Sequence, residues 1–394
     1  MAITLDGTTG ITTPSLTNTG AEAVTGNLTV NGNTTLGDAS TDTILMTGAP
    51  SIGGAGYGMG FGFRNRIING AMVIDQRNAG ASVTPSAGTY TLDRYAFTVT
   101  AASKLTCQQN AGSITPPVGF KNYLGITSSS AYSIGSGDLF QVYQAIEGLN
   151  IYDLAWGTAN ATTVTLSFWV RSSLTGTFGG AIQNSAQNRS YPYSYTILAA
   201  NTWEQKSITI AGDTTGTWLT TNGVGMYVGF GLGAGSTYSG TAGAWAGANY
   251  NSATGATSVV GTNGATFYIT GVQLEKGSTA TSFDYRPYGT ELALCQRYYQ
   301  RVGAFARQTG AAINTTGVIV PVPTPVTFRA TPSFSGSISQ MKSYSGGAVS
   351  IASITYAVND SFDSQVDIRF NGLSVSDNNN YWVSFNASSL SAEL

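Results

Sequence analysis

The chain contains no histidine and few charged residues. Without histidine, the sequence excludes Ser-His-Asp and Cys-His catalysis, and it excludes metal sites with histidine ligands. Charged residues make up 9% of the chain, whereas ordinary soluble proteins contain roughly 25%. The formal net charge is −2 and no basic block is present. Nucleic acids require a patch of Lys and Arg that neutralises phosphates, so we expect no nucleic-acid partner.

Cysteines and long apolar runs are also scarce. Cys107 and Cys295 have no metal-binding or redox spacing, and both lie in segments with apolar periodicity, so we expect two buried small hydrophobes. No run approaches the roughly 20 apolar residues of a membrane span, so we expect no membrane insertion. The N-terminal sequence MAITLDGTTG lacks the basic and apolar regions of a signal peptide. We therefore expect synthesis in the cytoplasm without an export signal.

Glycine, serine, threonine and asparagine fill the place of the missing charges, with 50 glycines in 394 residues. A surface of hydroxyls and amides suits a β-rich exterior protein better than a cytosolic enzyme. The length allows two or three domains with sizeable cores. In residues 1–63, short apolar positions alternate with Thr and Asn between glycines, which is typical of very short strands. One chain has too few large side chains here to build a core, so this region is either a shaft of three chains or a disordered linker.

Regular strand patterns fill residues 64–288 and predict a two-sheet β-sandwich. In the segment TVTLSFWVRSS, Val164, Leu166 and Phe168 alternate with Thr165, Ser167 and Trp169. The other predicted strands cover residues 104–108, 123–127, 139–146, 203–210, 225–231 and 267–274. Gly271 interrupts the alternation of the last strand and predicts a β-bulge.

Two polar clusters lie beside apolar strands near the start of this domain. They are Asp75-Gln76-Arg77 and Asp93-Arg94. Such clusters usually fasten strand ends through charge-assisted hydrogen bonds, and we expect that role here. Coordination of a ligand or of calcium by their oxygens is the alternative.

A short helix is predicted at residues 289–302, with a second β region from 303 to 394. Thr290 is a suitable N-cap, and Leu292, Cys295, Tyr299 and Val302 share one face of the expected helix Glu291–Val302. In the last region, Pro321, Pro323 and Pro325 occupy every second position, which suits an edge strand. We expect this region to be a sandwich-like tip.

Several stretches resemble the proteins of tailed-bacteriophage fibres. The closing segment VQLEKGSTATSFDYRPYGTELALCQRYYQ and the opening segments RNRIINGAMVIDQRNAG and TYTLDRYAFTVT resemble a jelly-roll module of phage tail-fibre and receptor-binding proteins. That module is similar to carbohydrate-binding modules. Residues 1–63 resemble a trimeric fibre shaft, and residues 303–394 more loosely resemble fibre tips.

The resemblance implies a homotrimer in the virion that adheres to glycans of the host surface. Its N-terminal region would attach to other tail proteins, and the lack of a signal peptide would be consistent with release within the virion. The resemblance is compatible with a structural calcium held by backbone carbonyls, but the sequence predicts no metal and no cofactor.

Two segments interrupt the strand rhythm and form the candidate glycan-binding surface. They are residues 178–195 and 232–261, and we expect both to be long irregular loops. Aromatic rings can cover the apolar face of a sugar while amides and hydroxyls bind its hydroxyl groups. The candidate residues are Tyr191, Tyr193, Tyr195, Tyr238, Trp245 and Tyr250. Packing beneath the loops or at a subunit contact is the alternative for the same rings.

The sequence therefore favours a non-enzymatic adhesion protein. A polysaccharide depolymerase is the first alternative, but glycoside hydrolysis usually needs two carboxylates about 5–10 Å apart, and no spacing pairs any two. A purely structural connector or decoration protein of the virion is the second.

Overall fold

The computed structural model describes residues 51–52, 55–56, 64–302, 308–351, 354–361, 364–376 and 379–394. The chain divides into two compact units, Met1–Phe61 and Gly62–Leu394. In the first, β1 (Ser51–Ile52) pairs with β2 (Ala55–Gly56). The predicted shaft of residues 1–63 otherwise lies outside the described residues. None of the described helices is both long and apolar enough to span a membrane.

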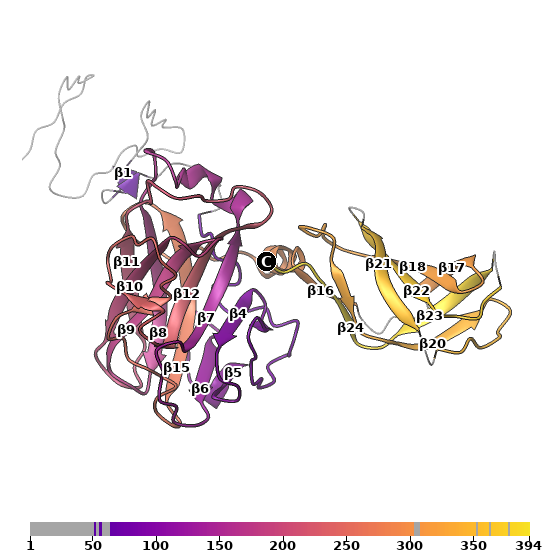
Figure 1. Ribbon diagram of the computed structural model, residues 1–394, viewed down its shortest axis with the longest axis horizontal. Coiled ribbons are helices and arrows are strands. Elements are labelled where there is room, and N and C mark those ends of the chain that lie inside the picture. The colour runs from indigo at the N-terminus through magenta and orange to yellow at the C-terminus, as the bar shows by residue number, and fades with distance from the viewer. Residues whose placement is uncertain are drawn as a thin grey trace, which may run out of the picture. The chain divides into compact units, whose positions relative to one another are not determined.

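The second unit begins with the predicted jelly-roll sandwich, which the structure confirms (Figure 1). One sheet contains β3 (Tyr90–Leu92), β4 (Tyr95–Val99), β7 (Leu139–Glu147), β9 (Gly176–Asn184), β10 (Ser190–Ile197) and β12 (Val224–Ala234). Its order is β10-β9-β12-β7-β4-β3. The other contains β5 (Leu105–Gln109), β6 (Leu124–Ser128), β8 (Val164–Ser172), β11 (Glu204–Ile210) and β15 (Thr266–Lys276), in the order β11-β8-β15-β6-β5.

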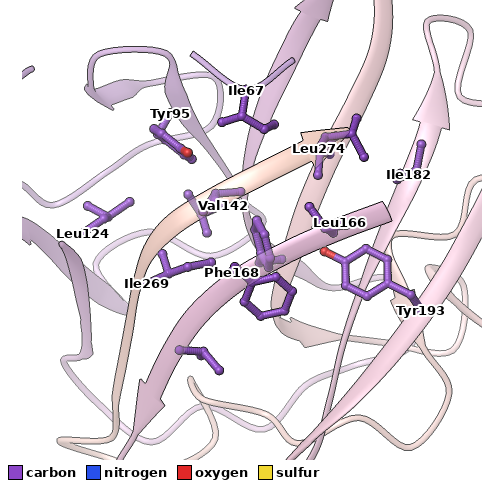
Figure 2. Packing of buried hydrophobic residues seen from close by; sticks show 14 of the residues in the cluster. Ile67, Tyr95, Leu124, Val142, Leu166, Phe168, Ile182, Tyr193, Ile269 and Leu274 are labelled. Atoms are coloured by element: carbon purple, nitrogen blue, oxygen red, sulfur yellow. The ribbon is translucent and has the colours of Figure 1, made fainter. Parts of the chain in front are cut away.

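The core lies between these sheets and follows the alternation seen in the sequence. Val164, Leu166 and Phe168 on β8 are fully buried, as are Phe230 on β12 and Val142 on β7. Figure 2 shows Leu166, Phe168 and Val142 packed together. Short elements connect the strands: η1 (Ala111–Ser113), η2 (Gly148–Asn150), η3 (Tyr152–Leu154), β13 (Ser239–Gly240) and β14 (Ser252–Ala253). Both cysteines are buried and unpaired, as predicted.

The predicted bulge in β15 is confirmed at Gly271. The register of β15 against β8 shifts between Thr270 and Gln273. Gly271 has φ +61°, and a Cβ there would lie 2.6 Å from the Phe120 ring, so glycine is required.

Buried amide side chains, in place of strand pairing, hold the segment that follows Arg64. Asn65 donates from Nδ2 to the carbonyl of Val272 (3.0 Å) and accepts at Oδ1 from the amides of Leu274 (3.0 Å) and Ile67 (2.9 Å). Gln144 forms the same kind of paired bond with both backbone groups of Ile68. These residues fix the first segment of the domain to its last strand.

The closing motif is also a self-contained hydrogen-bond network. Glu275 is 2% exposed and accepts from the amide (2.8 Å) and hydroxyl (2.7 Å) of Thr281 and from Gln273 Nε2 (2.9 Å). Gln273 Oε1 accepts from the amide of Asp284 at 2.8 Å. The polar residues of this motif therefore hold residues 281–284 against β15.

The polar clusters near the start of the domain fasten strand ends, as expected. Asp93 accepts from the amide of Gln76 at 2.6 Å and from its Nε2 at 2.7 Å. Asp75 accepts from the amides of Asn78 and Gly80. Burial raises the pKa of Asp93 to about 6, against the hydrogen bonds of Gln76 that lower it.

The predicted helix Glu291–Val302 is wrong in its bounds. The observed helix, α1 (Tyr288–Gln296), begins after Pro287, and Thr290 lies inside it rather than at the N-cap. Tyr299–Val302 is a strand, β16, which pairs with β24 (Ser388–Ser391). Pairing with a distant strand therefore overrides the local helical periodicity of Tyr299 and Val302. Since β16 belongs to the C-terminal sheets, "tip" below means residues 299–394.

The tip contains two sheets around one core, which confirms the predicted second sandwich-like region. Its three-stranded sheet has the order β16-β24-β19, with β19 at Ser333–Ser335. The strands of the six-stranded sheet are β17 (Gln308–Asn314), β18 (Gly317–Pro323), β20 (Ile338–Ser343), β21 (Thr355–Ser361), β22 (Gln365–Asn371) and β23 (Asn380–Phe385). Their order is β20-β23-β17-β18-β22-β21.

The prolines of β18 were expected on an edge strand, whereas β18 lies between β17 and β22. The registered pairs with β17 extend only from Gly317 to Ile319. Pro321 and Pro323 pair with β22 alone. The strand is therefore internal in the sheet order, while its proline half has a registered partner on one side only.

Candidate functional site

The aromatic residues expected to bind glycans lie in a different environment from the expected one. Residues 178–195 are not an irregular loop but the hairpin of β9 and β10. Tyr191, Tyr193 and Tyr195 are 9%, 1% and 6% exposed and face the core, because they occupy alternate positions of β10. The Tyr193 hydroxyl donates to the carbonyl of Gly229 at 2.8 Å. Figure 2 shows Tyr193 directed toward the buried cluster. The expectation that these three rings are on the surface is therefore wrong.

Trp245 is half-buried rather than exposed. Its ring centroid lies 5.2 Å from Tyr191, 5.3 Å from Trp156 and 5.6 Å from Trp218. Its Nε1 donates to the carbonyl of Ala211 at 2.8 Å. The glycine- and alanine-rich surroundings therefore let the indole approach other aromatic rings instead of solvent.

We predict that Trp245→Ala lowers the free energy of unfolding by about 2–4 kcal/mol, because it removes a large ring from an aromatic cluster. Urea unfolding measures this loss. Trp245→Phe is the matched control, since it keeps one ring and loses the bond to Ala211 and part of the indole's contact area, and we expect a smaller loss. A loss below about 0.5 kcal/mol for Trp245→Ala, the range of ordinary surface substitutions, would contradict this packing role.

Tyr238 and Tyr250 lie in the second segment, residues 232–261, which is largely irregular as predicted, apart from the end of β12 and the two-residue strands β13 and β14. Both rings are half-buried. A Cβ on Gly240 would lie 2.3 Å from the Tyr250 ring, so this ring packs against the backbone of its own loop. The same loop covers part of the jelly-roll sheet that contains β9, because Ser252 Oγ lies 2.6 Å from the Cβ position of Gly179.

The outward surface of β4, β7 and β12 forms a different candidate site. Tyr143 on β7 lies opposite Ala96 on β4 and Gly229 on β12, and Tyr227 on β12 lies opposite Ala145 on β7. Their neighbours along the strands, such as Val142 and Phe230, face the core, so these residues face away from it. We call the surface at Thr98, Gln141, Tyr143, Tyr227 and Gly229 the tyrosine face.

The tyrosine face combines aromatic rings with amide and hydroxyl groups. The rings of Tyr143 and Tyr227 are half-buried, with centroids 5.7 Å apart and planes at 75°. Gln141 Nε2 donates to Thr98 Oγ1 at 3.4 Å, and a Cβ on Gly229 would lie 2.8 Å from Gln141 Oε1. Burial raises the pKa of both tyrosines, so both phenols are neutral at neutral pH.

This face was not among the predicted sites, although the alternation of residues along β7 and β12 indicates it. In the strand LFQVYQAIE, Gln141 and Tyr143 alternate with Phe140 and Val142. In VGMYVGFGLGA, glycine alternates with buried Val228, Phe230 and Leu232. Because side chains alternate between the two faces of a strand, Gln141, Tyr143 and Tyr227 must lie on the face opposite the core, and this alternation alone identifies them.

Acidic residues do not form a metal-binding group in the part of the chain that the structure describes. No three His, Cys, Asp or Glu side chains gather there. The buried carboxylates are instead held by donors. Glu147 accepts from Arg297 at 2.6 and 2.9 Å and from the Tyr298 hydroxyl at 2.8 Å. Asp213 accepts from Arg189 at 2.6 and 2.9 Å.

No protein-family model and no curated protein matches this chain. Among solved structures, the enzymatically active domain of bacteriophage CBA120 tailspike protein 4 is 11% identical, with a TM-score of 0.30. That match covers 54% of this chain and only 21% of the tailspike chain.

Two carbohydrate-binding modules give comparable values. TmCBM61 in complex with β-1,4-galactotriose is 8% identical over 55% of this chain and 100% of its own, with a TM-score of 0.27. A family 11 module from Clostridium thermocellum, in complex with a mixed-linked tetrasaccharide, is 9% identical over 52% and 98%, with a TM-score of 0.25. At these scores, we rest no functional argument on the matches.

Proposed function

We propose that this protein is a non-catalytic glycan-binding protein and that its tyrosine face holds the sugar. The observation that carries the proposal is the pair of half-buried rings, Tyr143 and Tyr227, beside Gln141 over a floor of glycine and alanine. Aromatic rings pack against the C–H face of a pyranose. The amide and hydroxyl groups beside the rings bind the sugar hydroxyls.

The chemistry of the face favours a neutral or weakly anionic glycan. Its five defining residues carry no charge, and the phenols remain protonated. Coulombic attraction therefore contributes little, and binding should depend only weakly on salt.

The biological setting in this proposal is the tail of a bacteriophage. The segments 65–97 and 267–300 resemble phage receptor-binding modules, and residues 1–63 resemble a trimeric shaft that attaches to other tail proteins. In a homotrimer, three weak sites that engage one host surface gain avidity. The protein would be carried in the virion and would bind surface glycans of the host.

The carboxylates support binding rather than hydrolysis. Glycoside hydrolysis needs one carboxyl group to give a proton and a second to act as base or nucleophile. Glu147 and Asp213 are each held by an arginine, and Glu275 is held by Thr281 and Gln273. These hydrogen bonds occupy the oxygens that a catalytic pair would need.

Incubation of the purified protein with a panel of neutral bacterial polysaccharides tests the proposal. We expect at least one to be retained on the immobilised protein, with no new reducing ends and no change in its chain length. New reducing ends would instead indicate a depolymerase. If the protein neither retains nor cleaves any polysaccharide of the host surface, its role is structural and the proposal is contradicted.

A further inference from the structure

Glu393 of the tip lies within the hydrogen-bond network of the jelly roll. Its carboxylate accepts from Arg77 Nη2 at 2.6 Å and from Arg94 Nη1. The side chains of Glu393, Arg77 and Arg94 are 8%, 14% and 1% exposed. Both arginines belong to the opening segments of the jelly roll, about 300 residues before their acidic partner.

Each of the two arginines lies between Glu393 and the ring of a tyrosine that follows α1. The Arg94 guanidinium lies 3.6 Å from the centre of the Tyr298 ring, and that of Arg77 lies 3.7 Å from the Tyr299 ring. Burial by itself lowers the pKa of Arg94, but the Glu393 carboxylate, together with Tyr298, Tyr90 and Cys295, outweighs it, so the pKa of Arg94 is raised. Within the described residues, Glu393 is the acidic partner of both guanidinium groups.

A second set of contacts surrounds this ion cluster. Arg329 of the tip donates to the carbonyls of Ala392 (2.6 Å) and Glu393 (3.0 Å), and also to that of Asn222 in the jelly roll (2.7 Å). The Tyr90 hydroxyl donates to the carbonyl of Leu394 at 2.8 Å. Leu394 also packs against an apolar cluster that contains Ile68, Ile74, Cys295 and Tyr298.

We propose that Glu393 is an ionic clasp that fixes the tip to the jelly roll, so that the two unfold and move as one body. A buried guanidinium that loses its counter-ion has no solvent to replace it, so removal of one partner costs much more than a surface ion pair contributes. The clasp is a property of the fold and does not depend on glycan binding.

Glu393→Gln tests the clasp with little change in shape. Loss of the charge leaves both guanidinium groups without a carboxylate counter-ion, and we expect a decrease in Tm of about 6 °C or more. We also expect the single calorimetric transition of the parent to separate into two. Glu204→Gln is the matched control, because both members of the ion pair between Glu204 and Lys206 (2.6 Å) belong to the jelly roll. We expect at most a small change in the Tm of this variant.

Motion of the tip gives a second readout. Asn263 and Ser345 are exposed on the jelly roll and the tip, while Cys107 and Cys295 are buried, so Asn263→Cys and Ser345→Cys allow selective spin labelling. We expect a narrow distance distribution in the parent and a broad one in Glu393→Gln. If Glu393→Gln does not fold, Arg77→Met removes one half of the cluster and should broaden the distribution less. Distributions as narrow as in the parent, with a Tm like that of Glu204→Gln, would overturn the proposal.

Discussion

Asn65→Ala should lower the free energy of unfolding by about 3–9 kcal/mol, because it leaves three buried backbone groups unpaired at roughly 1–3 kcal/mol each. The Asn65 side chain is the partner of Val272, Leu274 and Ile67, and Asn65 is 1% exposed. Alanine offers neither a donor nor an acceptor at this position. Urea unfolding at neutral pH measures the loss.

Asn160→Ala is the matched control for this substitution. Asn160 is an exposed asparagine in the same domain, so the change should stay within about 0.5 kcal/mol. If both variants unfold at the same urea concentration, the amide of Asn65 does not fasten the opening segment to β15. The structural reading of the motif that contains Asn65 would then be wrong.

The double substitution Tyr143→Ala/Tyr227→Ala should weaken glycan binding by about 30- to 700-fold, if each ring contributes about 1–2 kcal/mol. The two rings lie in contact with each other at the centre of the tyrosine face. The measurement is a titration with the glycan that the parent retains, using variants whose folding has been checked by circular dichroism.

Tyr344→Ala/Tyr356→Ala is the matched control, since it also removes two tyrosines but from the tip. Tyr344 and Tyr356 are 66% and 40% exposed. We expect the affinity of this variant to remain within about twofold of the parent, because a distant surface residue contributes little to binding. Loss of binding in the control with retention in the first variant would place the receptor site in the tip.

The architecture of the jelly roll could be predicted because its strands obey a period of two. Val164, Leu166 and Phe168 are buried as their alternation indicates, and the bulge at Gly271 follows from a glycine inside an apolar strand. The roles of Asn65 and Gln144 could not be predicted. Apart from Ile67, their hydrogen-bond partners are 76 or more residues distant in sequence, and a local pattern contains no information about them.

Two errors have physical causes that are visible in the sequence. Tyr191, Tyr193 and Tyr195 alternate as a strand does, but Pro192 and the glycines before them favoured a loop. Pro192 is tolerated because β10 is the edge strand of its sheet. The helix was extended to Val302 because Tyr299 and Val302 continue its apolar face, whereas pairing of β16 with β24 determines their conformation.

The most direct test of the binding site is the hydrogen-exchange footprint of the bound glycan. The parent protein is compared with and without a saturating amount of the polysaccharide that it retains. The account predicts slower exchange in peptides that cover Leu139–Glu147 and Val224–Ala234, the strands of the tyrosine face. Protection confined to the tip, or to the loop around Trp245 with no change in β7 and β12, would contradict it.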